Sequence, residues 1–326
     1  EDRGIEILGV DIGGATTDVF SVFQGVFNRT VSANLGMSYS VSNVLAETGI
    51  ENVLRWAPFD VDERDLRNRI KNKMIRPTTI PQTLRELVIE QAIAREALRL
   101  ALEQHKRLAT GLHGVQQQRT IADAFAQGET GQSLVDMATL DLVVGSGGVL
   151  SHAPRRQQAM LMMIDAFEPV GVTELAVDSI FMMPQLGVLA QVNETAAMHV
   201  FNRDCLIHLG SVIAPQGEGN GNSAVRIVAT LPDGSAIDER VPAGEIRAYP
   251  LPEGASVQVD VTPEGAFDMG EGRGHAVRRQ ASGGVVGLVV DTRGRPLRLP
   301  DDPSQRRASL RRWYDTLDLY PSTVAN

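Results

Sequence analysis

The sequence is poor in cysteine, with Cys205 as the only one among 326 residues, so no internal disulfide bond is possible. This scarcity fits a reducing compartment, and we expect a cytoplasmic protein. No apolar run approaches the roughly 20 residues that a membrane-spanning helix needs, so no membrane partner is expected. The first residues, Glu1 to Gly4, contain neither an initiator methionine nor signal-peptide features. We therefore expect a part of a longer protein.

Basic residues are fewer than acidic ones, at 31 Lys and Arg against 40 Asp and Glu. The resulting net charge of −9 should repel phosphate backbones, so a nucleic-acid partner is not expected. The six histidines show no metal-ligand spacing, which argues against a structural zinc site. The composition is otherwise ordinary for a globular protein, and the length allows two hydrophobic cores.

Near the amino end, an apolar run at residues 5–10 leads into the segment DIGGATTD at residues 11–18, followed by a β-rich run at 19–23. Two such runs joined by a polar, glycine-containing tip predict a β-hairpin. The glycines leave room for a phosphate against backbone N–H groups, and the threonines offer hydroxyl donors. Asp11, at the end of a buried strand, needs a partner, and a hydrated Mg²⁺ on the phosphates would provide one. A hairpin turn without a ligand fits the same residues.

A second glycine-rich segment follows a predicted buried strand at residues 140–144 and has the sequence GSGG at 145–148. Glycine between a buried strand and a helix lets a flat ring or a phosphate lie against the main chain. A tight strand-to-helix turn is the alternative. A serine-hydrolase elbow is a poor fit, because Val144 occupies the first glycine position of the Gly-x-Ser-x-Gly motif.

Periodicity places the surest helix at residues 82–107, where apolar residues recur at helical spacing without Gly or Pro. Other helices are expected at 154–167 and 304–317, a strand and helix at 172–191, a β-hairpin at 225–241, and strands at 256–261 and 285–290. The basic residues of 64–76 alternate with acids, which favours a solvated helix face. Those of 273–279 lie among glycines, which favours a solvated loop.

Strands that alternate with helices indicate an α/β sheet, and the texture becomes β-rich after about residue 205. We predict an α/β domain at residues 1–205 with a helical insertion at about 40–135. A small β-rich domain at 206–326, ending in a helix, follows it.

The order and spacing of the two glycine segments resemble the second phosphate loop and the adenosine motif of the second lobe of actin/hexokinase/Hsp70 (ASKHA) ATPases. More specifically, four stretches resemble the MutL/GlmL family, accessory proteins of adenosylcobalamin-dependent glutamate mutase and related aminomutases. These stretches are residues 10–19, 72–78, 144–150 and 178–184, and the resemblance covers about residues 5–195.

The resemblance implies a ribonuclease-H-like ASKHA lobe that binds ATP or ADP with Mg²⁺, in a reactivase or chaperone-like partner of a cobalamin-dependent mutase. Asp11 would orient the Mg²⁺ through water, and Asp18 would be a further contact near the metal. The residues implied to hold phosphate are Gly13, Gly14, Ala15, Thr16 and Thr17. Those implied to border the adenosine or line the cleft are Gly145, Ser146, Gly147, Gly148 and Lys73.

In this superfamily the first phosphate loop belongs to a preceding first lobe, and nothing upstream of Ile5 supplies it. The resemblance therefore implies a missing first lobe as a partner, and it leaves open whether ATP is hydrolysed. Two alternatives remain. Hydantoinase and acetone-carboxylase proteins share a similar loop, which suggests an ATP-dependent enzyme component, although the histidine spacing supplies no metal site. A structural module of the same fold without nucleotide turnover is the other.

Overall fold

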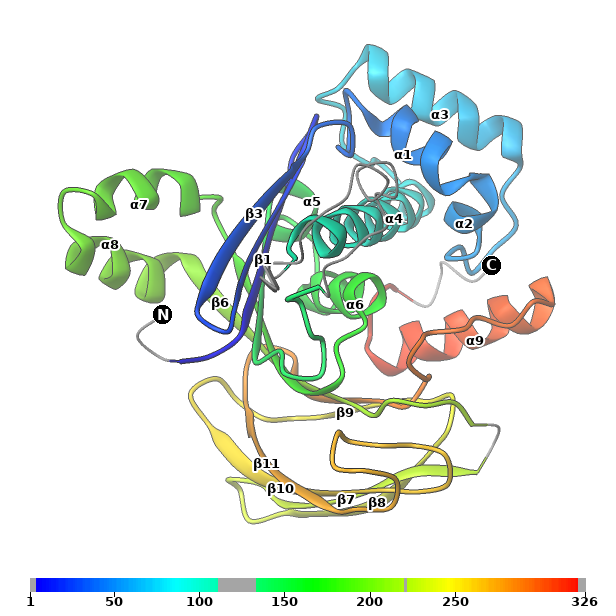
Figure 1. The fold of residues 1–326 in the computed structure, drawn as a ribbon. Helices are drawn as coiled ribbons and strands as arrows, with labels where there is room; N and C mark the ends of the chain where they lie inside the picture. The colour runs from blue at the N-terminus through cyan, green and yellow to red at the C-terminus, as the bar shows by residue number, and fades with distance from the viewer. Residues whose placement is uncertain (1–3, 111–132, 220–221, 322–326) are drawn as a thin grey trace, which may run out of the picture.

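The larger of two β-sheets begins with the predicted hairpin, in which β1 (Ile7–Ile12) and β2 (Thr17–Phe23) pair antiparallel. The computed structural model describes residues 4–110, 133–219 and 222–321 (Figure 1). Strand β3 (Val26–Ser32), which the sequence pattern did not predict, pairs with the outer edge of β2. On the other side of β1, β4 (Leu142–Ser146) and β5 (Gly171–Asp178) follow in parallel. The mixed α/β class is thus confirmed.

Three strands from the carboxy-terminal half extend this same sheet to the order β3-β2-β1-β4-β5-β6-β12-β9. They are β6 (Leu206–Ala214), β9 (Ile246–Tyr249) and β12 (Gly287–Asp291). Because β6 pairs antiparallel with β5, the predicted boundary after residue 205 falls between two neighbouring strands of one sheet. The separate β-rich part is therefore smaller than residues 206–326.

That smaller part is an antiparallel sheet of order β11-β10-β7-β8. Its strands are β7 (Ser223–Thr230), β8 (Ala236–Pro242), β10 (Ser256–Pro263) and β11 (Val277–Ser282). Its apolar face packs against β6 and β12 of the large sheet, while its outer face carries cross-strand ion pairs such as Arg226–Asp238 and Arg278–Asp260. Arg278 and Arg279 therefore belong to a strand, which corrects the loop expected at 273–279, because β10 supplies a pairing edge that periodicity does not reveal.

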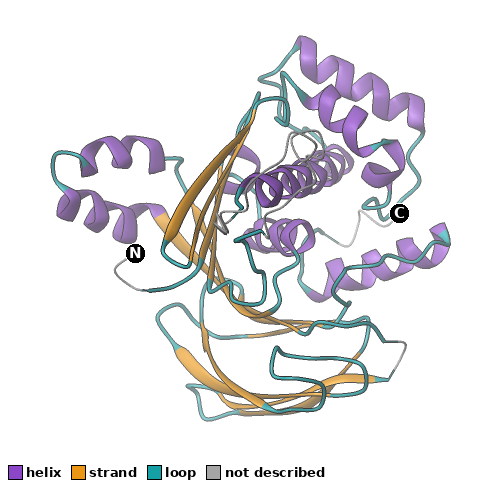
Figure 2. Ribbon diagram, viewed as in Figure 1, coloured by secondary structure: helices purple, strands orange, loops and turns teal. Residues whose placement is uncertain are grey.

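Most helices cover one face of the large sheet (Figure 2). The long helix α4 (Leu84–Leu108) starts at a capping box of Thr83 and Glu86 and packs with α6 (Arg156–Phe167) against β2 to β5. Between β3 and β4, α1 (Val41–Thr48), α2 (Ile50–Leu54) and α3 (Glu63–Ile75) precede α4. The insertion predicted at 40–135 is thus helical over its described part, and residues 111–132 lie outside the described residues.

On the other side, α7 (Met183–Ala190) and α8 (Glu194–Val200) form a helical hairpin that stands apart from the remaining helices (Figure 1). It leads through a π-helical turn, η1 (Phe201–Cys205), into β6. The short α5 (Gly148–Ser151) follows β4 directly. Among the described helices, none is both long and apolar enough to cross a membrane.

The last helix, α9 (Pro303–Thr316), ties the carboxy-terminal segment to the helical insertion. The Tyr314 hydroxyl donates to the backbone carbonyl of Trp56 at 2.9 Å, and the Tyr320 hydroxyl bonds to the side-chain oxygen of Gln91. The carboxy-terminal segment is therefore held against the helical insertion by hydrogen bonds between residues more than 200 positions apart.

A buried chain of five charged side chains continues this connection. Arg95 of α4 donates to Asp165 of α6 at 2.7 Å, and Arg293 reaches the other Asp165 oxygen at 2.7 Å. Arg293 and Arg295 both bind Asp291 at the end of β12, at 2.8 and 2.9 Å. All five side chains are buried, so this network joins the insertion, the sheet and the carboxy-terminal segment away from the protein surface.

Candidate functional site

The two glycine segments meet at one edge of the large sheet. The parallel pairing of β1 with β4 places Asp11 beside Ser146, and the chain then turns away from each strand. Gly147 has φ +95°, and a Cβ atom there would lie 2.2 Å from the carbonyl oxygen of Ile12. Only glycine allows this approach. The two glycine segments, which lie far apart in the sequence, are therefore in van der Waals contact.

A row of four polar side chains crosses the sheet at this edge. Asp18 pairs with Asp11 across the hairpin, Asp11 lies beside Ser146, and the Ser146 hydroxyl donates to Asp178 at 3.3 Å. Side chains at paired positions share a face of the sheet, and like charges directly opposite destabilise it. Three carboxylates in one row therefore need a counter-charge.

Among the described residues, a counter-charge is found at one end of the row, where Arg29 of β3 binds Asp18 at 2.7 Å. One carboxylate oxygen each of Asp11 and Asp18 is buried with no hydrogen-bond partner in the described ranges. A cation at this edge of the sheet would give these two oxygens a partner, and Mg²⁺ prefers such oxygen ligands.

The pKa of Asp11 reflects the same lack of a nearby positive charge. Burial, followed by the charges of Asp18 and Asp178, raises the pKa of Asp11 from its usual 3.8 to about 6. The folded protein thus holds this proton more tightly than the unfolded chain does. The free energy of unfolding should accordingly fall as the pH rises from about 4 through about 6.

The loss of stability with rising pH gives a prediction for Asp11→Asn, a substitution that removes the charge and keeps the shape of the side chain. We expect the variant to exceed the wild type in free energy of unfolding by about 1 kcal/mol at about pH 8, a value kept small because Asp11 is partly exposed. Near pH 4 the two proteins should unfold alike, because the wild-type carboxyl is protonated there. Urea unfolding at both pH values measures this, and an equal difference at both would contradict it.

The turn between β1 and β2 offers free backbone donors. The N–H of Gly13 closes the turn onto Thr16 at 2.8 Å, whereas those of Gly14, Ala15 and Thr16 have no acceptor within the described residues. Gly14 and Ala15 are exposed and Thr16 is half-buried. Consecutive free N–H groups in such a turn are typical of anion-binding concavities.

The turn is held from behind by the segment that leads into α1. The N–H groups of Met37 and Ser38 donate to the carbonyls of Gly13 and Gly14, both at 2.9 Å, and the Ser40 hydroxyl donates to Ala15. All three carbonyls point to this segment, so the N–H groups of the turn lie on its opposite side.

Two of the predicted contact residues have other tasks. Thr17 is fully buried and its hydroxyl donates to the carbonyl of Leu35, because the strand alternation turns it toward the core, so it offers no hydroxyl to a phosphate. A Cβ at Gly145 would lie 2.7 Å from the Met163 sulfur and 2.9 Å from Leu150, so core packing explains that glycine. Gly148, by contrast, borders open space.

Lys73 does not join the polar row. It binds Glu90 of α4 at 2.7 Å and the carbonyl of Thr79. It lines a pocket of about 740 Å³ between α3 and α4, which Met37 and Val41 also border. Since Met37 is bonded to Gly13, this pocket adjoins the hairpin turn.

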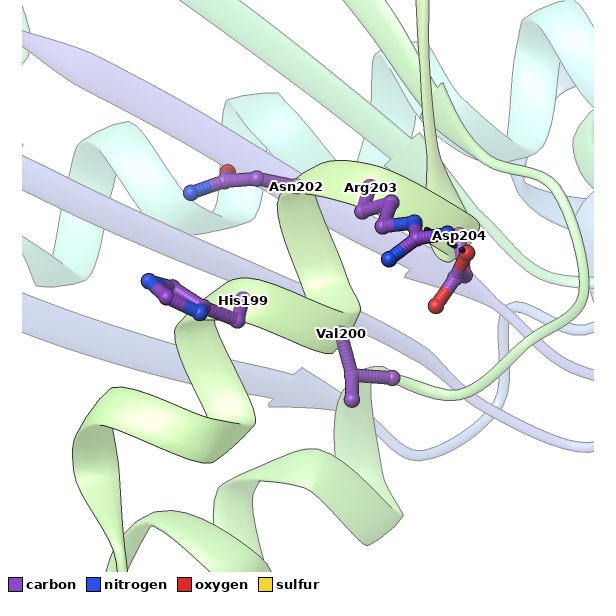
Figure 3. Close-up of a pocket in the computed structure, with 5 residues that line it drawn as sticks. All are labelled: His199, Val200, Asn202, Arg203 and Asp204. Atoms are coloured by element: carbon purple, nitrogen blue, oxygen red, sulfur yellow. Dashed lines mark ion pairs between the residues drawn. The ribbon is translucent and has the colours of Figure 1, made fainter.

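A second hollow, of about 430 Å³, lies at the end of α8 and contains none of the predicted site residues (Figure 3). It is lined by His199, Val200, Asn202, Arg203 and Asp204, of which Arg203 and Asp204 form an ion pair at 3.7 Å. Within the described ranges, no three His, Cys, Asp or Glu side chains are arranged to hold a metal alone. A Mg²⁺ ion at the row would thus depend on water and phosphate ligands as well.

Asp178 is a member of the row that the residue patterns did not single out. It is fully buried at the end of β5, and its oxygens accept from Ser146, Ile180 and Met183. Its place at the end of a predicted buried strand was a signal, but only the pairing of β5 with β4 shows that it faces the same site.

Comparison with known proteins shows which family the chain resembles. A family model described as "MutL protein" matches residues 1–205, more than half of the chain. A curated relative, Protein MutL of Clostridium tetanomorphum, is 24% identical over 213 residues, which are 59% of this chain and 43% of the relative. The chain therefore spans less than half the length of this relative.

Proposed function

Because the chain belongs to the MutL protein family, we propose that it is the nucleotide-binding lobe of an accessory protein for an adenosylcobalamin-dependent mutase such as glutamate mutase. The observation that carries this proposal is the contact between the two glycine segments beside the row of Asp11, Asp18 and Asp178. A ligand with phosphates and a Mg²⁺ ion would satisfy both the free N–H groups and the orphaned oxygens.

The strand order supports an ASKHA-type, ribonuclease-H-like lobe. β1 to β3 form an antiparallel meander, and β4 and β5 continue it in parallel beyond β1. Helices between β3 and β4 then correspond to the insertion of the second lobe. In open α/β sheets, ligands bind at the carboxyl ends of the parallel strands, and β1, β4 and β5 all end at the row.

The chain's own residues divide into three groups in this proposal. Gly14, Ala15 and Thr16 donate N–H groups to phosphate oxygens, while Asp11 and Asp18 hold the waters of Mg²⁺. Mg²⁺, when bound, neutralises phosphate charge. The adenosine lies between the Gly147–Gly148 turn and the pocket of Lys73, and Ser146 positions Asp178 rather than touching the ligand.

A first lobe is proposed as the partner that closes the other side of the ligand. The α7–α8 hairpin supports a partner there, because the N–H of its first residue, Met183, donates to Asp178 and the hairpin exposes apolar side chains. The exposed side chains on and beside it are Ile180, Phe181, Val188, Leu189, Val192, Met198 and Val200. Exposed apolar side chains gathered in one segment favour an interaction site. Ligand-dependent closure of two lobes would turn nucleotide binding into motion that acts on the mutase.

Calorimetric titration with ADP in the presence of Mg²⁺ tests the nucleotide site. We expect a dissociation constant of about 1 mM or tighter, and an increase of at least about tenfold for Asp11→Asn, because the metal loses its nearest carboxylate. Asp238→Asn, on the outer face of the second sheet, should bind like the wild type. Absence of binding by the wild type, with a first lobe supplied, would contradict the proposal.

The mutase partner is tested separately. Glutamate mutase inactivated during turnover is incubated with the full-length protein, adenosylcobalamin and Mg-ATP, and the recovered mutase activity is measured. We propose recovery with the wild type and little with Asp11→Asn. Equal recovery without ATP would leave the nucleotide site unconnected to the mutase.

A further inference from the structure

Tyr39 stands out as an exposed aromatic residue in a buried, tightly bonded segment. Its neighbours Met37, Ser38 and Ser40 are buried, whereas Tyr39 is 65% exposed. Its backbone N–H donates to the carbonyl of Gly14 at 2.9 Å. The main chain of Tyr39 is therefore fixed relative to the hairpin turn, and its side chain starts beside that turn.

The ring lies beside the turn that is proposed to hold phosphate. Its Cδ2 atom is 3.7 Å from the position that a Cβ would take at Gly14. Met37 and Val41, two residues before and after it, line the pocket between α3 and α4. Tyr39 is therefore close both to the turn with the free N–H groups and to two residues that border this pocket.

The exposed ring of Tyr39 has neither a polar nor an aromatic partner among the described residues. Over the described ranges the phenolic hydroxyl has no hydrogen-bond partner, and the ring takes part in no aromatic or cation–π pair. An exposed aromatic ring is stabilised when a ligand covers it, and a tyrosine side chain with two torsions loses little conformational entropy when it is ordered.

We infer that Tyr39 is a ligand-contacting residue whose ring covers the sugar between the phosphates and the base of the bound nucleotide. This inference rests on the proposed function and adds a residue that discriminates a nucleotide from a simple polyphosphate. Its contribution comes from the ring, so phenylalanine should replace tyrosine without loss.

Calorimetric titration of three variants with Mg-ADP and with Mg-pyrophosphate tests the inference. Tyr39→Ala should raise the dissociation constant of Mg-ADP about fivefold to tenfold and leave that of Mg-pyrophosphate within about twofold. Tyr39→Phe should bind both ligands within about twofold of the wild type. The matched control is Phe27→Ala, which removes a 58% exposed ring from β3 and should bind like the wild type. Melting temperatures check that each variant is folded.

Three results would overturn the inference. Unchanged Mg-ADP binding by Tyr39→Ala, beside normal wild-type binding, would remove Tyr39 from the site and leave the proposed function intact. An equal loss for Mg-pyrophosphate would place the residue on the phosphates, and an equal loss in Tyr39→Phe would assign the contact to the hydroxyl. A wild type that binds neither ligand would overturn the proposed function itself.

Discussion

Gly147→Ala is expected to lower the free energy of unfolding by roughly 3–5 kcal/mol, one of the largest effects of a single methyl group in this protein. The added Cβ would lie 2.2 Å from the Ile12 carbonyl oxygen and 2.7 Å from its carbon, both of which belong to the backbone of β1. Backbone atoms inside a sheet cannot move aside as a flexible side chain can. The φ of +95° adds strain for any residue with a Cβ.

The adjacent glycine provides the matched control. A Cβ at Gly148 meets nothing within 4 Å, so Gly148→Ala should change the free energy of unfolding by less than about 1 kcal/mol. Urea unfolding of both variants at neutral pH measures the difference. Similar stabilities of the two variants would mean that the ends of β1 and β4 are not in contact, and the proposed ligand site would lose its geometry.

The second large effect is expected in the buried ionic network. Asp291→Asn leaves Arg293 and Arg295 buried with one charged partner fewer, and breaking a buried pair in this way costs about 3–5 kcal/mol. Asp260→Asn removes an equally well-aligned carboxylate from Arg278, but on an exposed face, and should change the free energy of unfolding far less. The comparison separates burial from the loss of an ion pair.

The pH dependence of this difference follows from Asp291. Burial alone would raise the pKa of its carboxyl, but Arg293 and Arg295 outweigh burial and hold that pKa well below its usual range. A lowered pKa gives stability that is present above the unfolded value of about 4 and is lost as the pH falls through the folded value. The gap between wild type and Asp291→Asn should thus be constant from about pH 8 to pH 5. A gap that closes already between these values would contradict the network.

Sequence patterns located the elements whose signals are local. The alternation of residues 5–23 and the helical spacing of 82–107 agree with β1, β2 and α4, because one buried face imposes its period on a continuous segment. The family resemblance was likewise readable, since the motifs are short and continuous. The same alternation already implies that Thr17 and Val19 share the buried face, although the hydroxyl type suggested a phosphate contact.

Strands that pair with remote partners were harder to find. The segment 273–279 has the composition of a loop, and β11 forms there only because β10 offers a free edge. Likewise β6 begins where the sequence becomes β-rich, which suggested a new domain. Its backbone nevertheless continues the large sheet beside β5. Hydrogen bonds between strands are made by the backbone, so they leave little trace in the side chains.

The amino-acid order alone was enough for the two glycine segments, the acidic residues at the hairpin and the helical insertion, because each depends on neighbours along the chain. Only the folded chain decided that Asp178 lies in one row with Asp11, that Gly145 packs against the core and that Lys73 lines a pocket beside the hairpin turn instead of joining the row. The physical reason is that these relations are set by which strands and helices lie side by side. That choice depends on the sum of many distant contacts rather than on any short stretch of residues.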